Sequence, residues 1–291
     1  MTRSIAFHSY KGGTGKSTIG ANLSALMARR GLTVVLLDLD IYAPSLQGYF
    51  HQRPEKWIND FLFENAQVED VIHDLTPLIE KIESTNSFSD IKGKIFVGFS
   101  NPSKEEIYRL DGAVRQESSK IQLLRKFILL RENIVSTYNP DFIIIDTSPG
   151  IRYWSINALA VADTIFLSLK MDGIDVEGTR IMAREIYDNF TKLGTKSYLL
   201  LNRVAGYCLP PSLNQEGVAS GSQNYSAVLN EQSMSIKKLN TDLNLDVISS
   251  IPCYCDIQFN SEEYLTALKN PDHPFSAKLN ELVDNLQSMI Q

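Results

Sequence analysis

The sequence between positions 11 and 18 reads Lys11-Gly12-Gly13-Thr14-Gly15-Lys16-Ser17-Thr18. It follows an apolar, strand-like run at 5–9 and precedes a run at 17–30 in which apolar residues recur with helical spacing. Glycines between a strand and a helix let backbone N–H groups turn inward, where they and the helix N-terminus bind phosphate oxygens. This arrangement predicts a phosphate site, with Lys16 neutralising the phosphates and the Ser17 hydroxyl binding Mg²⁺.

Further strand-like runs lie at 33–37, 94–99, 141–145, 164–169, 198–201 and 247–251. These runs are continuously apolar, which favours a sheet buried on both faces. Because helix-like runs separate them, the sequence predicts an α/β fold of three layers: a mostly parallel, twisted sheet with helices on both faces. No linker divides residues 1–291, so we expect one domain. A flexible insertion is expected at about 205–232, where glycine, proline, serine and asparagine are frequent.

Three of the strand-like runs are followed directly by a polar residue: Asp38, Asp146 and Asn202. Parallel sheets bind ligands beyond the carboxyl ends of their strands, which is also the edge where the glycine-rich loop is expected. We therefore expect the loop and these three side chains to form one site.

A second lysine, Lys11, lies five positions before Lys16. A loop with this extra lysine resembles the deviant Walker A loop of the ParA/MinD family of P-loop ATPases, and the resemblance covers nearly the whole chain. It implies a P-loop NTPase fold, Mg²⁺-dependent hydrolysis of ATP, and an ATP-bound homodimer in which Lys11 reaches the nucleotide of the other subunit. The sequence departs from the general loop pattern at Tyr10, where glycine is usual.

Two segments resemble the switch regions of this family. The first reads Asp38-Leu39-Asp40-Ile41-Tyr42-Ala43-Pro44-Ser45, and the second reads Asp146-Thr147-Ser148-Pro149-Gly150. The resemblance implies that Asp40 orients or deprotonates the attacking water. It also implies that Asp38 and Asp146 support the Mg²⁺ bound by Ser17. An aspartate at a strand end can instead serve as a helix cap or a turn residue.

Asn202 and Arg203 after one strand, and Pro252 after the next, resemble the base-binding segments of the family. The Asn202 amide can pair with the adenine edge, and Arg203 can stack on the ring. Position 205 is alanine, so the guanine-reading pattern N-K-x-D is missing and ATP is favoured over GTP. The alternative for these residues is an ordinary polar surface turn.

The three cysteines leave a second function open. The first-switch sequence also resembles the Mrp branch, whose members handle iron–sulfur clusters and carry C-x-x-C near the place of Cys208, but position 211 is proline here. Cys253 and Cys255 from two subunits could form a four-sulfur site. Alternatively, all three cysteines are small buried hydrophobes of a reduced, cytoplasmic protein. A third possibility is a metabolic P-loop enzyme that needs a second substrate.

The charge distribution bears on the partners. The formal net charge is −6, and acidic residues outnumber basic ones from position 196 onward, which argues against nucleic acid as a partner. The run at 276–290 has an apolar helical face, but its polar face is acidic, so we expect it to pack on the sheet rather than bind a membrane. We expect a nucleotide-switched protein that positions or regulates a protein partner, which the sequence does not identify.

Overall fold

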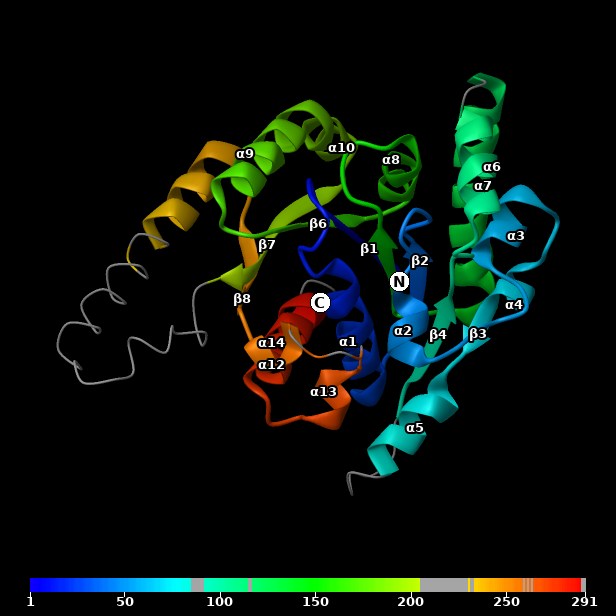
Figure 1. Ribbon diagram of the computed structural model, residues 1–291, viewed down its shortest axis with the longest axis horizontal. Coiled ribbons are helices and arrows are strands. Elements are labelled where there is room, and N and C mark those ends of the chain that lie inside the picture. Colours follow the sequence, from blue (N-terminus) through cyan, green and yellow to red (C-terminus); the bar gives the residue numbers. More distant parts are fainter. Residues whose placement is uncertain are drawn as a thin grey trace.

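The computed structural model describes residues 1–84, 92–114, 117–204, 230, 233–258, 260, 262 and 264–288. Its centre is an eight-stranded sheet with the strand order β3-β4-β2-β5-β1-β6-β7-β8 (Figure 1). The strands are β1 (Arg3–His8), β2 (Thr33–Leu39), β3 (Ile72–Asp74), β4 (Lys94–Gly98), β5 (Phe142–Thr147), β6 (Thr164–Leu169), β7 (Lys196–Val204) and β8 (Val247–Pro252). All neighbouring pairs are parallel except β3 and β4, which confirms the predicted fold class.

The central strands owe their position to their composition. β5 is buried over its whole length and lies between β1 and β2, so that Ile144 pairs with Ile5 on one side and Leu36 on the other. β-branched side chains on both faces of such a strand pack against two helical layers. The parallel register brings the carboxyl ends of β1, β2 and β5 to one edge of the sheet.

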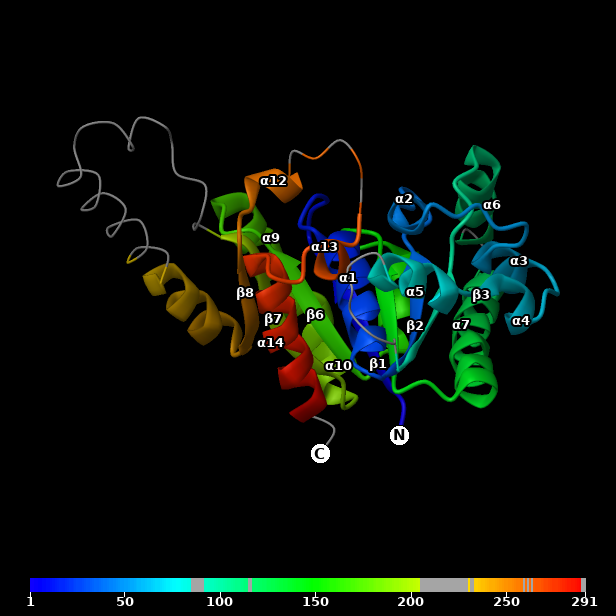
Figure 2. The same ribbon diagram turned by 90° about the horizontal axis from the view of Figure 1, so that it is seen from below.

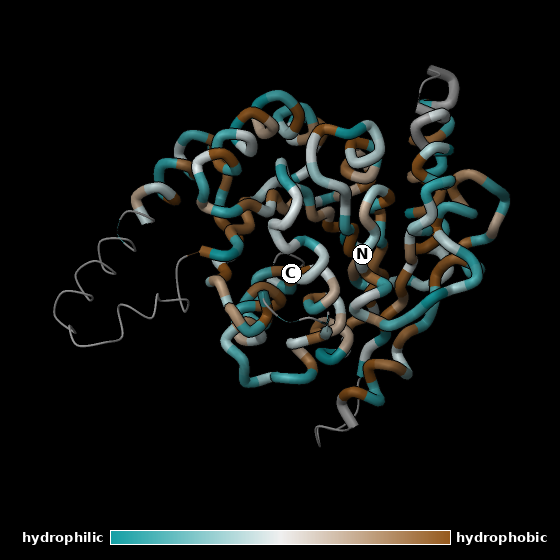
Figure 3. Tube along the Cα trace, viewed as in Figure 1, coloured by the Kyte–Doolittle hydropathy of each residue, from teal (hydrophilic) through white to brown (hydrophobic). Residues whose placement is uncertain are grey.

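Helices cover both faces, as the sequence predicts. One face packs against α1 (Lys16–Arg29), α2 (Leu46–Phe50), α5 (Thr76–Ser84), α13 (Thr266–Lys269) and α14 (Pro274–Ser288), with α12 (Cys255–Gln258) nearby (Figure 2). The other face packs against α3 (Ile58–Phe63), α4 (Val68–Val71), α7 (Glu117–Tyr138), α8 (Tyr153–Ala160), α9 (Gly173–Met182) and a helical segment over 233–243. The π-helix η1 (Ala183–Tyr187) and α10 (Asp188–Lys192) continue α9, and α6 (Lys104–Val114) precedes α7. Figure 3 shows hydrophobic and hydrophilic residues alternating along the outer helices.

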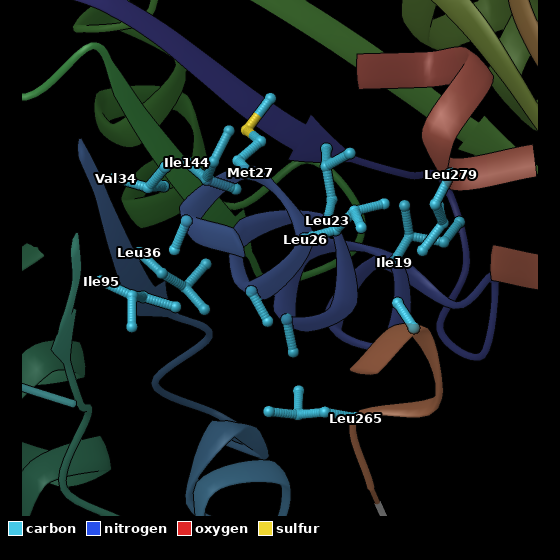
Figure 4. Close-up of a cluster of buried hydrophobic side chains, with 14 of the residues drawn as sticks. Ile19, Leu23, Leu26, Met27, Val34, Leu36, Ile95, Ile144, Leu265 and Leu279 are labelled. Atoms are coloured by element: carbon cyan, nitrogen blue, oxygen red, sulfur yellow. The ribbon is translucent and has the colours of Figure 1, made fainter. Parts of the chain in front are cut away.

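Helix α1 is buried almost all round. Ile19, Leu23 and Leu26 are at most 1% exposed and lie among side chains of β2, β4, β5 and the C-terminal helices (Figure 4). Because these contacts surround α1, the helix cannot shift along its axis without losing them. They therefore fix the position of its first residue, Lys16, at the end of the glycine-rich loop.

The C-terminal helix α14 buries its apolar face. Leu279, Leu282 and Val283 are fully buried, and the helix packs on α1 and β8. Within the described ranges, no helix combines the length and hydrophobicity needed to cross a membrane. The expected insertion at 205–232 lies outside the described residues apart from residue 230.

Candidate functional site

The loop between β1 and α1 has a backbone that requires glycine at two places. Gly13 and Gly15 have φ angles of 73° and 85°, in the left-handed region that residues with a β-carbon rarely adopt. A β-carbon at Gly15 would also lie 2.2 Å from Asn202 Nδ2. No side chain caps the N-terminus of α1, so its first N–H groups remain available to an anion.

Lys16 extends into the interior of this loop. The residue is 6% exposed, and its Nζ atom donates to Ser9 Oγ at 2.8 Å. Burial lowers the pKa of the Lys16 ammonium group, while Asp146, Asp40 and Asp175 act in the opposite direction. A buried ammonium group whose only described hydrogen bond is to a hydroxyl is stabilised by a bound anion such as a phosphate.

Asp146 provides the matching place for a cation. The residue is fully buried, its Oδ2 atom accepts a hydrogen bond from Ser17 Oγ at 2.5 Å, and its Oδ1 atom has no partner in the described part of the chain. Burial raises the pKa of Asp146 to about 6, against the opposing charge of Lys16. A carboxylate oxygen without a partner, beside a serine hydroxyl, fits the oxygen donors that Mg²⁺ takes together with phosphate and water.

Asp38 has a structural task. Its carboxylate accepts hydrogen bonds from the backbone N–H groups of Asp40, Ser45 and Leu46, each at 3.2 Å. Burial, together with the neighbouring Asp146, raises the pKa of Asp38 well above its usual value. Asp38 therefore fixes the loop after β2 to the start of α2, as the alternative cap or turn role implies. Its support of Mg²⁺ stays a prediction.

Asp40 and Lys11 both lie at the edge of the site. Asp40 is 8% exposed, and its charge raises the pKa of the Lys16 ammonium group, against the effect of burial. Lys11 is half-buried, and its carbonyl accepts a hydrogen bond from Ser9 Oγ at 2.6 Å. The structure thus brings together the loop, both lysines and the three aspartates. Their catalytic and metal-binding roles stay predictions.

A small pocket of about 100 Å³ adjoins the loop where adenine is expected. Its lining includes Gly15, Thr18, Asn202, Arg203 and Pro252. The Asn202 amide is already engaged, because Nδ2 donates to the Thr14 carbonyl at 2.8 Å and Oδ1 accepts from Arg203 N–H at 2.9 Å. In this structure Asn202 therefore braces the loop, which leaves Arg203 and Pro252 as the candidates for contact with the base.

Sequence reasoning missed two residues that border the loop. Tyr10, which replaces the usual glycine, packs its ring against Gly178 in α9. A β-carbon added at Gly178 would lie only 2.0 Å from Tyr10 Cδ1. His8 is wholly buried at the end of β1, with Nδ1 2.8 Å from Thr147 Oγ1. The sequence does show a bulky residue at a position where glycine is usual and a histidine inside an apolar strand. Neither feature reveals which residue it contacts, Gly178 for Tyr10 and Thr147 for His8.

The cysteines do not form a metal site in the described residues. No group of three or more His, Cys, Asp or Glu side chains suited to a metal occurs there, and the predicted Ser17–Asp146 site has a different donor set, because one of its two side chains is a hydroxyl. Cys253 Sγ contacts Gln258 Oε1 at 3.1 Å. Cys255 is the first residue of α12, and the expectation of a reduced thiol stays a prediction. Cys208 lies outside the described residues.

Comparison with known sequences identifies relatives over the first two thirds of the chain. Residues 2–196 match the family described as AAA domain. The sporulation initiation inhibitor protein Soj of Bacillus subtilis is 27% identical over 180 residues, which make up 61% of this chain and 62% of that protein. The chain thus matches less than two thirds of the length of this relative. The iron–sulfur cluster carrier protein of Aquifex aeolicus is 46% identical over 52 residues, only 18% of this chain and 14% of that protein.

Solved structures show the same fold over the whole chain. The cell division ATPase MinD of Pyrococcus furiosus has a TM-score of 0.70 at 19% identity, covering 99% of this chain and all (100%) of that one. The septum site-determining protein MinD of Pyrococcus horikoshii, complexed with Mg-ADP, has a TM-score of 0.68 at 18% identity and covers 100% of this chain and 98% of that one. The family match, the fold and the glycine-rich loop with its two lysines all indicate the same kind of protein. The chain belongs to the family described as AAA domain, and it shares the fold of the MinD proteins.

Proposed function

We propose that this chain binds ATP with Mg²⁺, hydrolyses it, and uses the change of nucleotide to control a homodimer that positions or regulates a protein partner. One observation carries the proposal: the buried Lys16 ammonium group lies near the buried Asp146 carboxylate, whose Oδ1 atom has no hydrogen-bond partner among the described residues. Lys16 and Asp146 occupy the same sheet edge, and burial opposes the charge of each. Mg²⁺ with a triphosphate supplies an anion for Lys16 and a cation for Asp146 at once.

The residues present fit these two ligands. The backbone of residues 12–17 and the N-terminus of α1 would bind the β- and γ-phosphates, and Lys16 would neutralise them. Ser17 and Asp146 would hold Mg²⁺, which offsets charge on the phosphates when it is bound. The pocket beside Arg203 and Pro252 would accept the adenine.

Hydrolysis needs a group that orients water, and Asp40 supports that role. Water attacks the γ-phosphorus, the bond from that phosphorus to the β–γ bridging oxygen breaks, and ADP leaves with that oxygen. Asp40 orients the water and accepts its proton, while Lys16 stabilises the charge that develops on the phosphoryl group.

A dimer across the loop edge is supported by the side chains exposed there. Ile151 follows β5 and is 53% exposed, Ile174 follows β6 and is 66% exposed, and Tyr10 follows β1 and is 36% exposed. Apolar side chains exposed around a site indicate a surface that becomes covered. Lys11 lies on the same edge, where it can reach the γ-phosphate of a facing subunit. The names of the relatives, which concern cell division and sporulation, support a role in positioning or regulation.

Sedimentation of three samples tests the dimer. We expect the wild type with ADP to be a monomer, since ADP lacks the phosphate that Lys11 would bind. Asp40→Ala with ATP should be a dimer, because hydrolysis is blocked, and Asp40→Ala/Lys11→Ala with ATP should be a monomer. If all three samples have the same mass, nucleotide does not control assembly and the switch proposal is wrong.

An iron–sulfur carrier remains the alternative, favoured by the 52-residue match to such a protein. It predicts iron and sulfide in anaerobically purified protein, lost when Cys253 and Cys255 are both replaced by serine. Under the ATPase proposal the double variant keeps its hydrolysis rate, and metal is not present in stoichiometric amounts.

A further inference from the structure

Ser148 joins the two loops that flank the site. It is fully buried after β5, and its Oγ atom donates to Asp40 Oδ1 at 2.6 Å, across 108 positions of sequence. β2 and β5 are parallel neighbours in which Asp38 is opposite Asp146, so the loops that follow them leave the sheet side by side. The hydrogen bond therefore connects the two segments that the family resemblance identifies as switches.

The two oxygens of the Asp40 carboxylate have different surroundings. Oδ1 accepts the Ser148 hydroxyl and, at 3.2 Å, the backbone N–H of Ala43. No residue of the described ranges donates to Oδ2, which is therefore available to water. The χ2 torsion of aspartate is broad, so a carboxylate without such an anchor rotates freely. One fixed oxygen and one available oxygen are what a water-orienting group requires.

Ser148 is itself held in place. Its carbonyl accepts a hydrogen bond from Ser155 Oγ at 2.9 Å, and the following Pro149 restricts its backbone. Next to Asp40, the Leu39 carbonyl accepts a hydrogen bond from Trp154 Nε1 at 2.9 Å. The first turn of α8 thus holds the first-switch backbone, and the Ser148 hydroxyl sets the direction of the carboxylate.

We infer that Ser148 is a positioning residue for hydrolysis, which acts by fixing the rotation of the Asp40 carboxylate. The inference rests on the proposed role of Asp40. Loss of the hydroxyl leaves the phosphate loop and the nucleotide pocket intact, so ATP affinity is preserved. The hydrolysis rate falls on the order of 10- to 100-fold, the effect expected when a catalytic group is misplaced by a fraction of an ångström to an ångström.

The test is a double-mutant cycle. Single-turnover hydrolysis and ATP affinity are measured for the wild type, Ser148→Ala, Asp40→Asn and the double variant. Ser24→Ala is the control, because Ser24 is a buried serine in α1 whose hydroxyl has no partner among the described residues.

We expect Ser148→Ala to be slowed at least tenfold with ATP affinity within twofold of the wild type. In the Asp40→Asn background the same substitution should change the residual rate less than twofold. Ser148→Cys, nearly isosteric but a weak donor, repeats the measurement if the alanine variant does not fold.

The outcomes separate this inference from the function on which it rests. If Asp40→Asn hydrolyses ATP as fast as the wild type, the proposed role of Asp40 is wrong. If Asp40→Asn is slow but Ser148→Ala matches Ser24→Ala, only the positioning role is wrong. An equal loss of rate from Ser148→Ala in both backgrounds would show a general structural effect and would also overturn the inference.

Discussion

At the scale of single residues, the site consists of buried charged groups of both signs. Lys16, Asp38 and Asp146 are all buried, and burial shifts each pKa toward the uncharged form. The sequence predicted these residue types at these positions because each of them lies in a short contiguous segment, namely 11–18, 38–45 and 146–150. It could not predict that the Asn202 amide binds the Thr14 carbonyl, since that contact joins residues 188 positions apart and depends on how β7 lies beside the loop.

His8 yields a prediction about acid stability. Burial, reinforced by the charge of Lys16, lowers the pKa of His8 from 6.5 to about 3. Between these pH values the unfolded chain binds a proton that the folded chain does not, so the free energy of unfolding falls as the pH drops through this window. At about 1.4 kcal/mol per pKa unit, the effect is roughly 4–5 kcal/mol. The raised pKa of Asp146 has the opposite effect on stability. Its contribution to the free energy of unfolding is lost as the pH rises from 3.8 to about 6.

Comparison with His8→Asn isolates the histidine, because the asparagine Nδ2 atom takes the place of the ring Nδ1 atom and can still donate to Thr147, but it does not titrate. Urea unfolding of both proteins from pH 7 to pH 4 should show the wild type losing stability relative to the variant below pH 6.5. Parallel curves for the two proteins would contradict the burial of a neutral imidazole.

At the scale of elements, the sequence predicted the strands well and the contacts between elements poorly. Each predicted run coincides with a strand to within two or three residues at its ends. The exception is β3, which was missed because three residues, Ile72–Asp74, give no apolar run, and because it pairs antiparallel at the edge. The contact of α9 with the loop was also invisible, since it depends on the absence of a side chain at Gly178.

Gly178 and Tyr10 give a prediction at this scale. Alanine in place of a helical glycine normally stabilises a protein by about 0.5–1 kcal/mol. Here the added carbon would overlap the Tyr10 ring, so we expect Gly178→Ala to destabilise by roughly 1–3 kcal/mol. In a Tyr10→Ala background the same change should stabilise. Urea unfolding of the four proteins of this cycle measures both effects, and the same sign in both backgrounds would refute the packing argument.

At the scale of the whole molecule, nucleotide and metal should stabilise the fold together. A ligand present at 100 times its dissociation constant adds about 2.7 kcal/mol, which at about 2.1 cal/mol/K per residue corresponds to a rise in Tm of roughly 4 °C for a chain of 291 residues. We expect ATP with Mg²⁺ to raise Tm by this amount, and EDTA to remove most of the increase because Ser17 and Asp146 lose the cation. Lys16→Ala should show no increase. An unchanged shift in EDTA would mean that Mg²⁺ does not contribute to binding.

The strand order also has a consequence for synthesis of the chain. β1 is made first, but its two neighbours in the sheet are β5 and β6, which begin only at Phe142 and Thr164. A nascent chain that ends before residue 142 contains the entire glycine-rich loop, yet β1 has no strand beside it and Ser17 has no Asp146. The loop is therefore synthesised long before it can bind its ligand, and ATP with Mg²⁺ can stabilise the fold only after Asp146 has been added to the chain.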